Sequence, residues 1–291
     1  MKTLCRFGLF VLIACTGIGS PSIWAQTADG GLPDSPSVVL NRAPSPHDGP
    51  AAAPADAGGA PESPTERQAT WRTLPGNFLH DQKKIWLTYP AELAHGRHWA
   101  PTLAVAGGTA GLIYADPHVM PYFREHQRNL DDFNDGFDAY ITTGMVISVP
   151  ASLMVGGYVR HDQRTVSSAL LCAEAYGDSA IVNLAIKAIT RRQRPIDIPV
   201  GGNYHDTFFN GGKSPFHGSS FPSGHTTGVF SVATVVANRY ARHRWAPPLA
   251  YAFATVISLS RITTAAHWPS DVFLGAAIGY STAKYAVLRP Q

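Results

Sequence analysis

The chain has 291 residues, a formal net charge of +3 at neutral pH and a mean hydropathy of -0.05. This length is sufficient for one sizeable hydrophobic core, in one or two domains. The basic excess is small for a nucleic-acid binder, and no run of Lys and Arg is longer than Arg191-Arg192. The charge balance therefore argues against a nucleic-acid partner and favours a small anionic substrate.

Residues 1–25 have the three parts of an export signal. Lys2 and Arg6 form a charged start, an apolar run follows, and the tripeptide I-W-A precedes a possible cleavage point at Gln26. The sequence L-I-A-C, ending at Cys15, also resembles a lipoprotein box, and an uncleaved membrane anchor is a third interpretation. Each of these interpretations places the following residues outside the cytoplasm, so the expected location is a bacterial-type periplasm.

The next segment, residues 26–70, has the composition of a linker. It contains eight proline, nine alanine and five glycine residues and almost no aromatic or branched apolar side chain. Such a segment cannot bury enough surface to offset the entropy of ordering, so we expect it to be disordered. The folded domain is expected over residues 71–291.

From Trp71 onward the pattern is helical. No Asn-Gly hairpin signal separates alternating apolar segments, which argues against strands. We therefore predict an all-α bundle of about six core helices. The apolar, alanine-rich stretches that define them lie at about 99–115, 137–159, 165–190, 226–241, 247–260 and 270–287.

The sequence gives opposing signals on whether these helices cross a membrane. Residues 139–159 lack charge over 21 positions, which is enough to span a bilayer. The connectors 160–164 and 239–244 are basic whereas 116–136 is acid-rich, which is the bias of a spanning bundle. However, 165–190 carries three charged residues and 247–260 is short.

Topology adds a difficulty for a spanning bundle. If all six segments crossed with the reactive residues outside, the first would begin in the cytoplasm, whereas an export signal places residues 26–98 outside. We therefore expect a soluble or peripherally attached bundle. The alternative is a membrane-embedded bundle with its site on the periplasmic side, and the sequence gives no indication of oligomeric state.

The stretch from Ser260 to Asp271 carries the first candidate chemistry. His267 and Asp271 are four residues apart, and Pro269 suits the first turn of a helix. On a helix, positions four apart are neighbours, so the carboxylate can hold the imidazole in one tautomer. The other ring nitrogen is then free as a nucleophile, with Arg261 as a nearby cation.

A second cluster, K-A-I-T-R-R-Q-R-P, begins at Lys187. Lys187 and Arg194 are seven residues apart, or two helical turns, so they can grip one anion. Arg194 offers a planar fork for phosphate and Lys187 a point charge. Arg191 and Arg192 are expected to form a solvated helix end.

A third cluster, F-P-S-G-H, ends at His225 just before an apolar helix. A Ser-Gly pair at a helix start offers an anion main-chain N–H groups and the positive end of the helix dipole. Ser223 adds a hydroxyl. His225 can then pass a proton to a leaving group.

Together, the motifs K-x6-R-P, P-S-G-H and S-R-x5-H-x3-D resemble the type 2 phosphatidic acid phosphatase (PAP2) superfamily. That superfamily includes bacterial class A acid phosphatases, membrane lipid phosphatases and vanadium haloperoxidases. The motifs span residues 187–271, so the leader, the linker and residues 71–98 lie outside the resemblance. The matching positions are Lys187, Arg194, Pro195, Pro222, Ser223, Gly224, His225, Ser260, Arg261, His267 and Asp271.

The resemblance implies a covalent mechanism on phosphorus. His267 would attack to form a phosphohistidine while Asp271 orients it, and His225 would protonate the departing alcohol and then activate water. Neither a metal nor another cofactor is implied, because cations of the chain stabilise the phosphoryl charge. The groups that would hold the phosphoryl oxygens are Lys187, Arg194, Ser223, the Gly224 amide and Arg261.

The expected function is an exported, metal-independent phosphatase of phosphate monoesters, either soluble or lipid. The alternative is an integral-membrane lipid phosphate or undecaprenyl pyrophosphate phosphatase. A vanadium-dependent haloperoxidase and an inactive envelope scaffold are less expected. The connector 196–221, which carries His205, Phe208 and His217, is either a lip over the phosphate pocket or an irregular surface loop.

Overall fold

The chain folds into helices. A computed structural model describes residues 66–211 and 218–289, and no strand occurs within these two ranges. The all-α fold class is therefore confirmed for the described residues. The expected export signal and nearly all of the expected linker lie outside the described residues, so both stay predictions.

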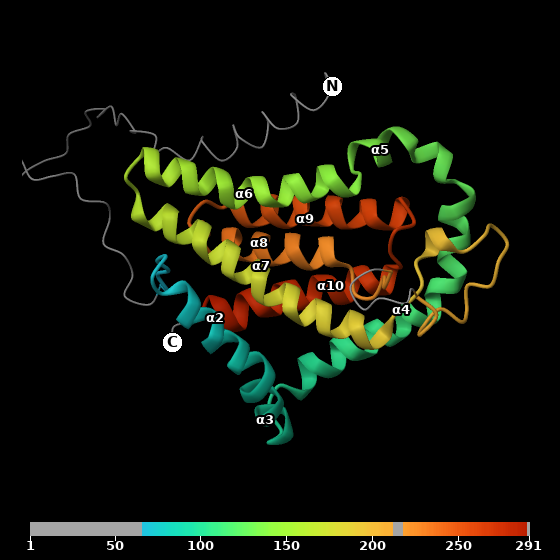
Figure 1. Cartoon of the computed structure of the whole chain (residues 1–291), viewed down its shortest axis with the longest axis horizontal. Helices are drawn as coiled ribbons and strands as arrows, with labels where there is room; N and C mark the ends of the chain where they lie inside the picture. The colour runs from blue at the N-terminus through green and yellow to red at the C-terminus, as the bar shows by residue number, and fades with distance from the viewer. Residues whose placement is uncertain (1–65, 212–217, 290–291) are drawn as a thin grey trace, which may run out of the picture.

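The first helices form a V on one side of the molecule (Figure 1). One arm consists of α2 (Leu74–Lys83), a π-helical segment (Lys84–Thr88) and α3 (Tyr89–Ala94), and the other arm is α4 (Trp99–Glu125). Helix α5 (Asp131–Gly136) follows α4 and leads to the bundle. The sequence did not predict α2 and α3, because polar residues interrupt every short apolar stretch there. Helix α4 extends beyond the predicted stretch, 99–115, and continues through Pro117 and Pro121.

Helices α6 to α10 form the bundle beside this V (Figure 1). Their bounds are α6 (Ala139–Val159), α7 (Gln163–Thr190), α8 (Gly224–Arg239), α9 (Ala246–Thr263) and α10 (Pro269–Ser281), which continues as a π-helical segment, Thr282–Val287. Each lies within a few residues of a predicted stretch. Asp138 and Asp162 begin α6 and α7 by accepting hydrogen bonds from main-chain N–H groups of the first turn.

Helix α8 is the centre of the bundle, since α6, α7, α9 and α10 all pack against it. Its packing against α10 depends on two glycines. A Cβ on Gly279 would lie 2.2 Å from the carbonyl oxygen of Thr227, and one on Gly275 would lie 2.7 Å from that of Ser223. The two backbones are therefore in direct contact, which brings the N-terminal end of α10 beside that of α8.

Residues 66–70 belong to the folded part of the chain. Ala69 and Arg67 are buried, although both fall in the segment expected to be disordered. Arg67 donates hydrogen bonds to the carboxylates of Asp81 and Glu174 and to the carbonyl oxygen of Val287. These partners are distant in sequence, so local composition could not reveal them.

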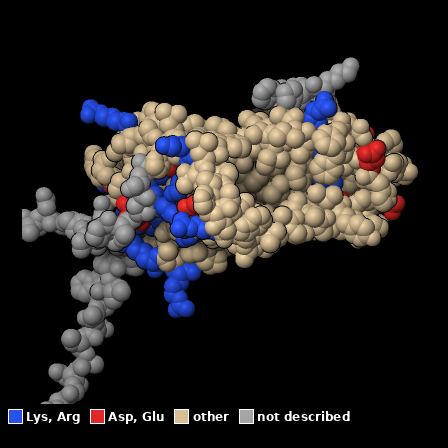
Figure 2. Space-filling model, turned by 90° about the horizontal axis from the view of Figure 1, so that it is seen from below, with Lys and Arg blue, Asp and Glu red and all other residues tan. Residues whose placement is uncertain are grey.

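The face of the molecule shown in Figure 2 has charged ends and an uncharged belt. In Figure 2 the Lys, Arg, Asp and Glu side chains gather towards the two ends, with a broad belt of other residues between them. Within residues 66–211 and 218–289, two segments are long and apolar enough to cross a membrane: α6, and residues 163–197, which include α7. Only 17% of the most apolar window of α6 is buried, compared with 50% for the other segment. Most residues of this window of α6 are thus exposed or only partly buried.

Candidate functional site

Three segments distant in sequence meet at one end of the bundle: the C-terminal end of α7, the N-terminal end of α8 and the turn before α10. They enclose a cavity of about 350 Å³. Lys187, Arg194, Gly224, His225 and His267 all line it. The structure therefore brings one residue or more from each predicted motif to a single cavity.

His267 is held through its Nδ1 atom. Nδ1 lies 2.8 Å from the carbonyl oxygen of Ser220 and 3.5 Å from Oδ2 of Asp271. The carbonyl is thus the nearer acceptor and the carboxylate a second, longer contact. A carbonyl oxygen can only accept, so the proton of the neutral ring lies on Nδ1 and Nε2 keeps its lone pair.

Asp271 is fixed on three sides. Its Oδ2 accepts a hydrogen bond of 2.9 Å from the main-chain N–H of Trp268, and its Oδ1 one of 2.8 Å from Arg192. Its carbonyl oxygen accepts from the N–H of Ser223 at 2.9 Å, which ties the start of α10 to the start of α8. The carboxylate beside His267 therefore has little freedom to move.

Burial of the imidazole lowers the pKa of His267 to about 4. The hydrogen bond and negative charge of Asp271 oppose this shift, while the positive charges of Lys187 and Arg194 add to it. His267 is consequently neutral at physiological pH.

Arg192 was expected to be a solvated helix end, and that expectation is wrong. It is 1% exposed and lies after the end of α7, where its guanidinium bridges Asp271 and Asp116 at 2.8 Å each. It also donates to Ser270 at 2.7 Å and packs 4.5 Å from the ring centre of Phe208. The one sequence signal for this network is Asp116, a lone carboxylate in the apolar stretch of α4.

Two cations line the cavity: Lys187 in the last turn of α7 and Arg194 in the segment that follows it. The Nζ atom of Lys187 donates to the carbonyl oxygen of Ser219 at 2.8 Å. Arg194 lines the cavity, and within the described ranges no hydrogen bond or ion pair engages its guanidinium. Arg194 is thus available for an anion, and Lys187 retains two further N–H groups.

His225 contacts a helix that the sequence motifs did not include. Its Nε2 lies 3.2 Å from Oγ1 of Thr143 and 3.3 Å from the carbonyl oxygen of Ala139, both on α6. Thr143 also lines the cavity. The first turns of α6 therefore form one wall of the site, which sequence reasoning missed because α6 carries no charged residue.

Ser223 and Arg261 lie beneath the surface of the site. Ser223 is fully buried, and its hydroxyl accepts a hydrogen bond of 3.0 Å from Thr226. Arg261 is 2% exposed and donates to the hydroxyl of Ser260 at 3.1 and 3.0 Å. Neither is among the residues that line the cavity. The motif residues thus divide into a lining set and a supporting set.

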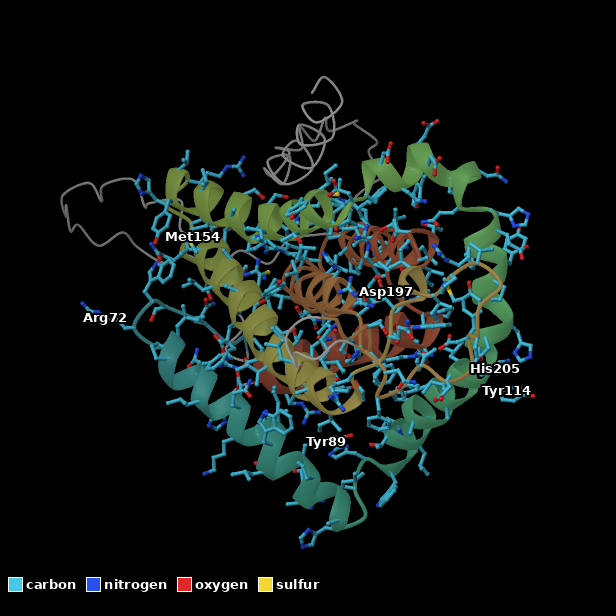
Figure 3. All side chains as sticks on the ribbon, turned by 45° about the vertical axis from the view of Figure 1, so that its right-hand side comes forward. Arg72, Tyr89, Tyr114, Met154, Asp197 and His205 are labelled. Carbon is cyan, nitrogen blue, oxygen red and sulfur yellow. The ribbon has the colours of Figure 1, made fainter. Side chains whose placement is uncertain are left out.

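The connector 196–221 contacts both α4 and the segment after α7: Arg124 of α4 donates to the carbonyl oxygen of Ile198, and the N–H of Gln193 donates to that of Thr207. Figure 3 places His205 beside Tyr114 of α4, and the ring of His205 lies 6.1 Å from that of His118, edge to face. Of its described residues, Gly218 and Ser219 line the cavity. His217 lies outside the described residues, so the lip over the pocket stays a prediction.

Parts of the chain are similar to known proteins. Residues 168–291 match the family model described as PAP2 superfamily. A stretch of 62 residues is 42% identical to a lipid A 1-phosphatase of Porphyromonas gingivalis, covering 21% of this chain and 14% of that relative. The chain thus matches about a seventh of the length of this curated relative. The crystal structure of a transmembrane PAP2 type phosphatidylglycerolphosphate phosphatase from Bacillus subtilis aligns at 18% identity and a TM-score of 0.36, over 73% of this chain and 91% of that one.

Proposed function

We propose that this chain, whose residues 168–291 match the PAP2 superfamily model, hydrolyses the phosphate monoester of a membrane lipid through a phosphohistidine. The observation that carries the proposal is the pair of imidazoles on one cavity. His267 has its Nδ1 proton fixed by Ser220, and His225 lies on the α8 side with Lys187 and Arg194 between the same walls. This arrangement suits in-line displacement at phosphorus.

The first step uses the free lone pair of His267. Nε2 attacks phosphorus while the bond from phosphorus to the ester oxygen breaks, and protonated His225 gives its proton to the departing alkoxide. Positive charge develops on the attacking ring, and Asp271 at 3.5 Å stabilises it. Lys187 and Arg194 balance the negative charge on the phosphoryl oxygens.

The second step regenerates the enzyme. His225, now neutral, accepts a proton from a water molecule as the water oxygen attacks phosphorus and the P–N bond breaks. Inorganic phosphate leaves, and His267 returns to its neutral form with the proton on Nδ1. Each proton that His225 gives up in the first step is thus recovered in the second.

Two observations favour a lipid over a soluble monoester. Beyond the cations, apolar side chains of α6 and α7 continue the cavity wall, namely Val146, Tyr176, Ala180 and Leu184. The uncharged belt of Figure 2 and the exposed apolar face of α6 suit a membrane environment. The similarity to a lipid A 1-phosphatase supports the same choice, so the membrane-embedded alternative replaces the soluble bundle as our interpretation.

The test is phosphate release by the full-length protein in detergent, in buffer with EDTA. Wild-type protein should release phosphate from phosphatidate or a lipid A phosphate, and His267→Ala should lower the rate by at least about a thousandfold. His205→Ala, on the connector beside α4, is the matched control and should keep the rate. A wild-type protein with no activity on either lipid or on a soluble aryl phosphate would refute the proposal.

The intermediate has its own signature. Brief incubation with a ³²P-labelled substrate followed by denaturation should leave label on the protein that is stable to alkali and lost in acid, as expected of a phosphohistidine. The label should be absent from His267→Ala. Label that survives acid and is lost in alkali would indicate a different nucleophile.

A further inference from the structure

A second cluster of ionisable side chains lies away from the cavity, between α2 and α7. Asp81 comes from α2, whereas Glu174 and Asp178 are one turn apart on α7. Each offers a carboxylate oxygen, and these three oxygens lie within 4.8 Å of one another. All three side chains are buried, with exposed fractions of 0%, 3% and 0%. The proposed phosphoryl transfer uses none of them.

The charges of this cluster do not balance. Arg67 is its cation, with Nη1 2.9 Å from Asp81 and Nη2 on Glu174. Lys84 is within electrostatic range of Asp81, but no ion pair joins them in the described part of the chain. Three carboxylates against one guanidinium leave a formal charge of −2, in a place without access to water.

Asp178 gives the second, independent sign of a missing ligand. Its Oδ1 accepts a hydrogen bond of 2.7 Å from the side-chain amide of Gln82. Its Oδ2 is buried and has no hydrogen-bond partner among the described residues. A buried carboxylate oxygen without a partner is costly, and it is costlier still if α7 lies in a membrane.

We propose that Asp81, Glu174 and Asp178 bind a hard divalent cation, Mg²⁺ or Ca²⁺. Carboxylate oxygens are the ligands that these ions prefer, and a charge of +2 brings the cluster with Arg67 to neutrality. The ion gives Asp178 Oδ2 its partner. It joins α2 to α7, so its role is to fix the V of α2 and α4 on the bundle.

The test is the thermal stability of the full-length protein in detergent after removal of metal with EDTA and dialysis. Titration with MgCl₂ or CaCl₂ should raise the Tm by about 5–10 °C at a hundredfold excess over the Kd. Mn²⁺ serves as a spectroscopic probe, since its electron paramagnetic resonance signal reports stoichiometric binding. Asp178→Asn should lose both the Tm rise and the bound Mn²⁺.

Two comparisons make the result specific. Asp132→Asn, in the exposed acidic segment of α5, should keep the full effect of the cation. Asp178→Asn removes one uncompensated charge, so without cation it should unfold at a higher temperature than metal-free wild type. Its phosphatase rate at a temperature where both are folded should equal that of the wild type, so the outcome is independent of the proposed function.

Two results would overturn the proposal. Metal-free wild type that binds no Mn²⁺ and shows no Tm change up to 10 mM MgCl₂ or CaCl₂, on the order of a hundredfold excess over a weak site, would mean that the carboxyl groups share protons instead. A Tm rise that persists in Asp178→Asn would place the ion elsewhere.

Discussion

The proton on Nδ1 of His267 has two acceptors, and the nearer one belongs to the main chain. The sequence predicted that Asp271 alone would orient the imidazole. In the structure, the carbonyl of Ser220 at 2.8 Å fixes the tautomer, and Asp271 at 3.5 Å supplies negative charge. Orientation and charge compensation are therefore provided by separate groups. A side-chain substitution can remove the carboxylate of Asp271 but not the main-chain carbonyl of Ser220.

The acid limb of the pH profile of the proposed reaction follows from His267, whereas the need for a protonated His225 sets the limb at higher pH. Burial lowers the pKa of His267 to about 4 from an unperturbed value near 6.5, and the nucleophile must be neutral. The neutral fraction therefore remains high until the pH falls through about 4. We expect kcat/KM, corrected for ionisation of the substrate phosphate, to have its acid limb near pH 4.

Asp271→Asn provides the comparison for this profile. Loss of the carboxylate removes a group that raises the pKa of His267, so the acid limb should move to lower pH while the maximal rate falls. An acid limb near pH 6.5 in the wild type would mean that the imidazole is hydrated in solution. The lowered pKa of His267 also makes folding less favourable in acid. Between pH 6.5 and 4 the unfolded chain binds a proton at this imidazole that the folded chain does not bind.

The motifs predicted the basic residues that line the cavity but only some of the residues that support them. Lys187, Arg194 and His267 were found because their spacing is fixed within short segments. Arg192 was misassigned because its partners, Asp271 and Asp116, are 79 and 76 residues away. The role of Ser220 could not be predicted from the sequence, because it contributes a main-chain carbonyl oxygen, which every residue possesses.

At the level of elements, the site depends on the contact between α8 and α10. The proposed chemistry lies at the N-terminal ends of both helices, where the N–H of Ser223 donates a hydrogen bond to the carbonyl oxygen of Asp271. Gly275 and Gly279 permit this approach along the helix pair. A substitution in the contact between α8 and α10 should therefore also alter the geometry of the site.

Gly279→Ala tests this dependence. Its new Cβ would lie 2.2 Å from the carbonyl oxygen of Thr227, a main-chain atom that cannot rotate away, so α10 must shift. We expect a loss of about 1–3 kcal/mol in the free energy of unfolding, together with a lower kcat. Denaturant unfolding in detergent and phosphate release measure the two effects.

Gly107→Ala on α4 is the matched control. A Cβ at that exposed helical position meets no atom within 4 Å. This variant should be neutral or more stable by about 0.5–1 kcal/mol, because alanine favours a helix over glycine. If both variants behave alike, helix propensity rather than the contact between α8 and α10 governs the stability.

The long helices were predictable and the short ones were not. Apolar runs of helix length define α6 to α10 without reference to the rest of the chain. In contrast, α2 is held by Asp81 and Gln82, whose partners Arg67 and Asp178 come from the supposed linker and from α7. A helix that depends on tertiary contacts of this kind leaves little trace in local periodicity.

For the whole molecule, the residues at the two ends of the bundle bear on its orientation in a membrane. Because α7 and α8 run in opposite directions, Arg164 and Arg239 lie at one end, whereas Lys187 and Gly224 lie at the other. Glu66 pairs with both arginines of the first end, at 2.8 and 3.2 Å. The described chain thus begins at the end opposite to the cavity.

This arrangement sharpens the topological conflict seen in the sequence. A cleaved export signal would carry Glu66 out of the cytoplasm and leave the cavity of a spanning bundle inside. The basic connectors 160–164 and 239–244 favour the reverse, since Lys and Arg are retained in the cytoplasm. We therefore expect the cavity outside and Glu66 inside.

Cysteine labelling in intact cells measures this orientation. The background would replace Cys5 and Cys15 by serine and keep Cys172, which is buried. With a membrane-impermeant maleimide, Asp132→Cys at the cavity end should react in intact cells, and Arg242→Cys only after permeabilisation. Labelling of both without permeabilisation would indicate an exported bundle that does not span the membrane, and the reverse pattern would place the phosphatase site in the cytoplasm.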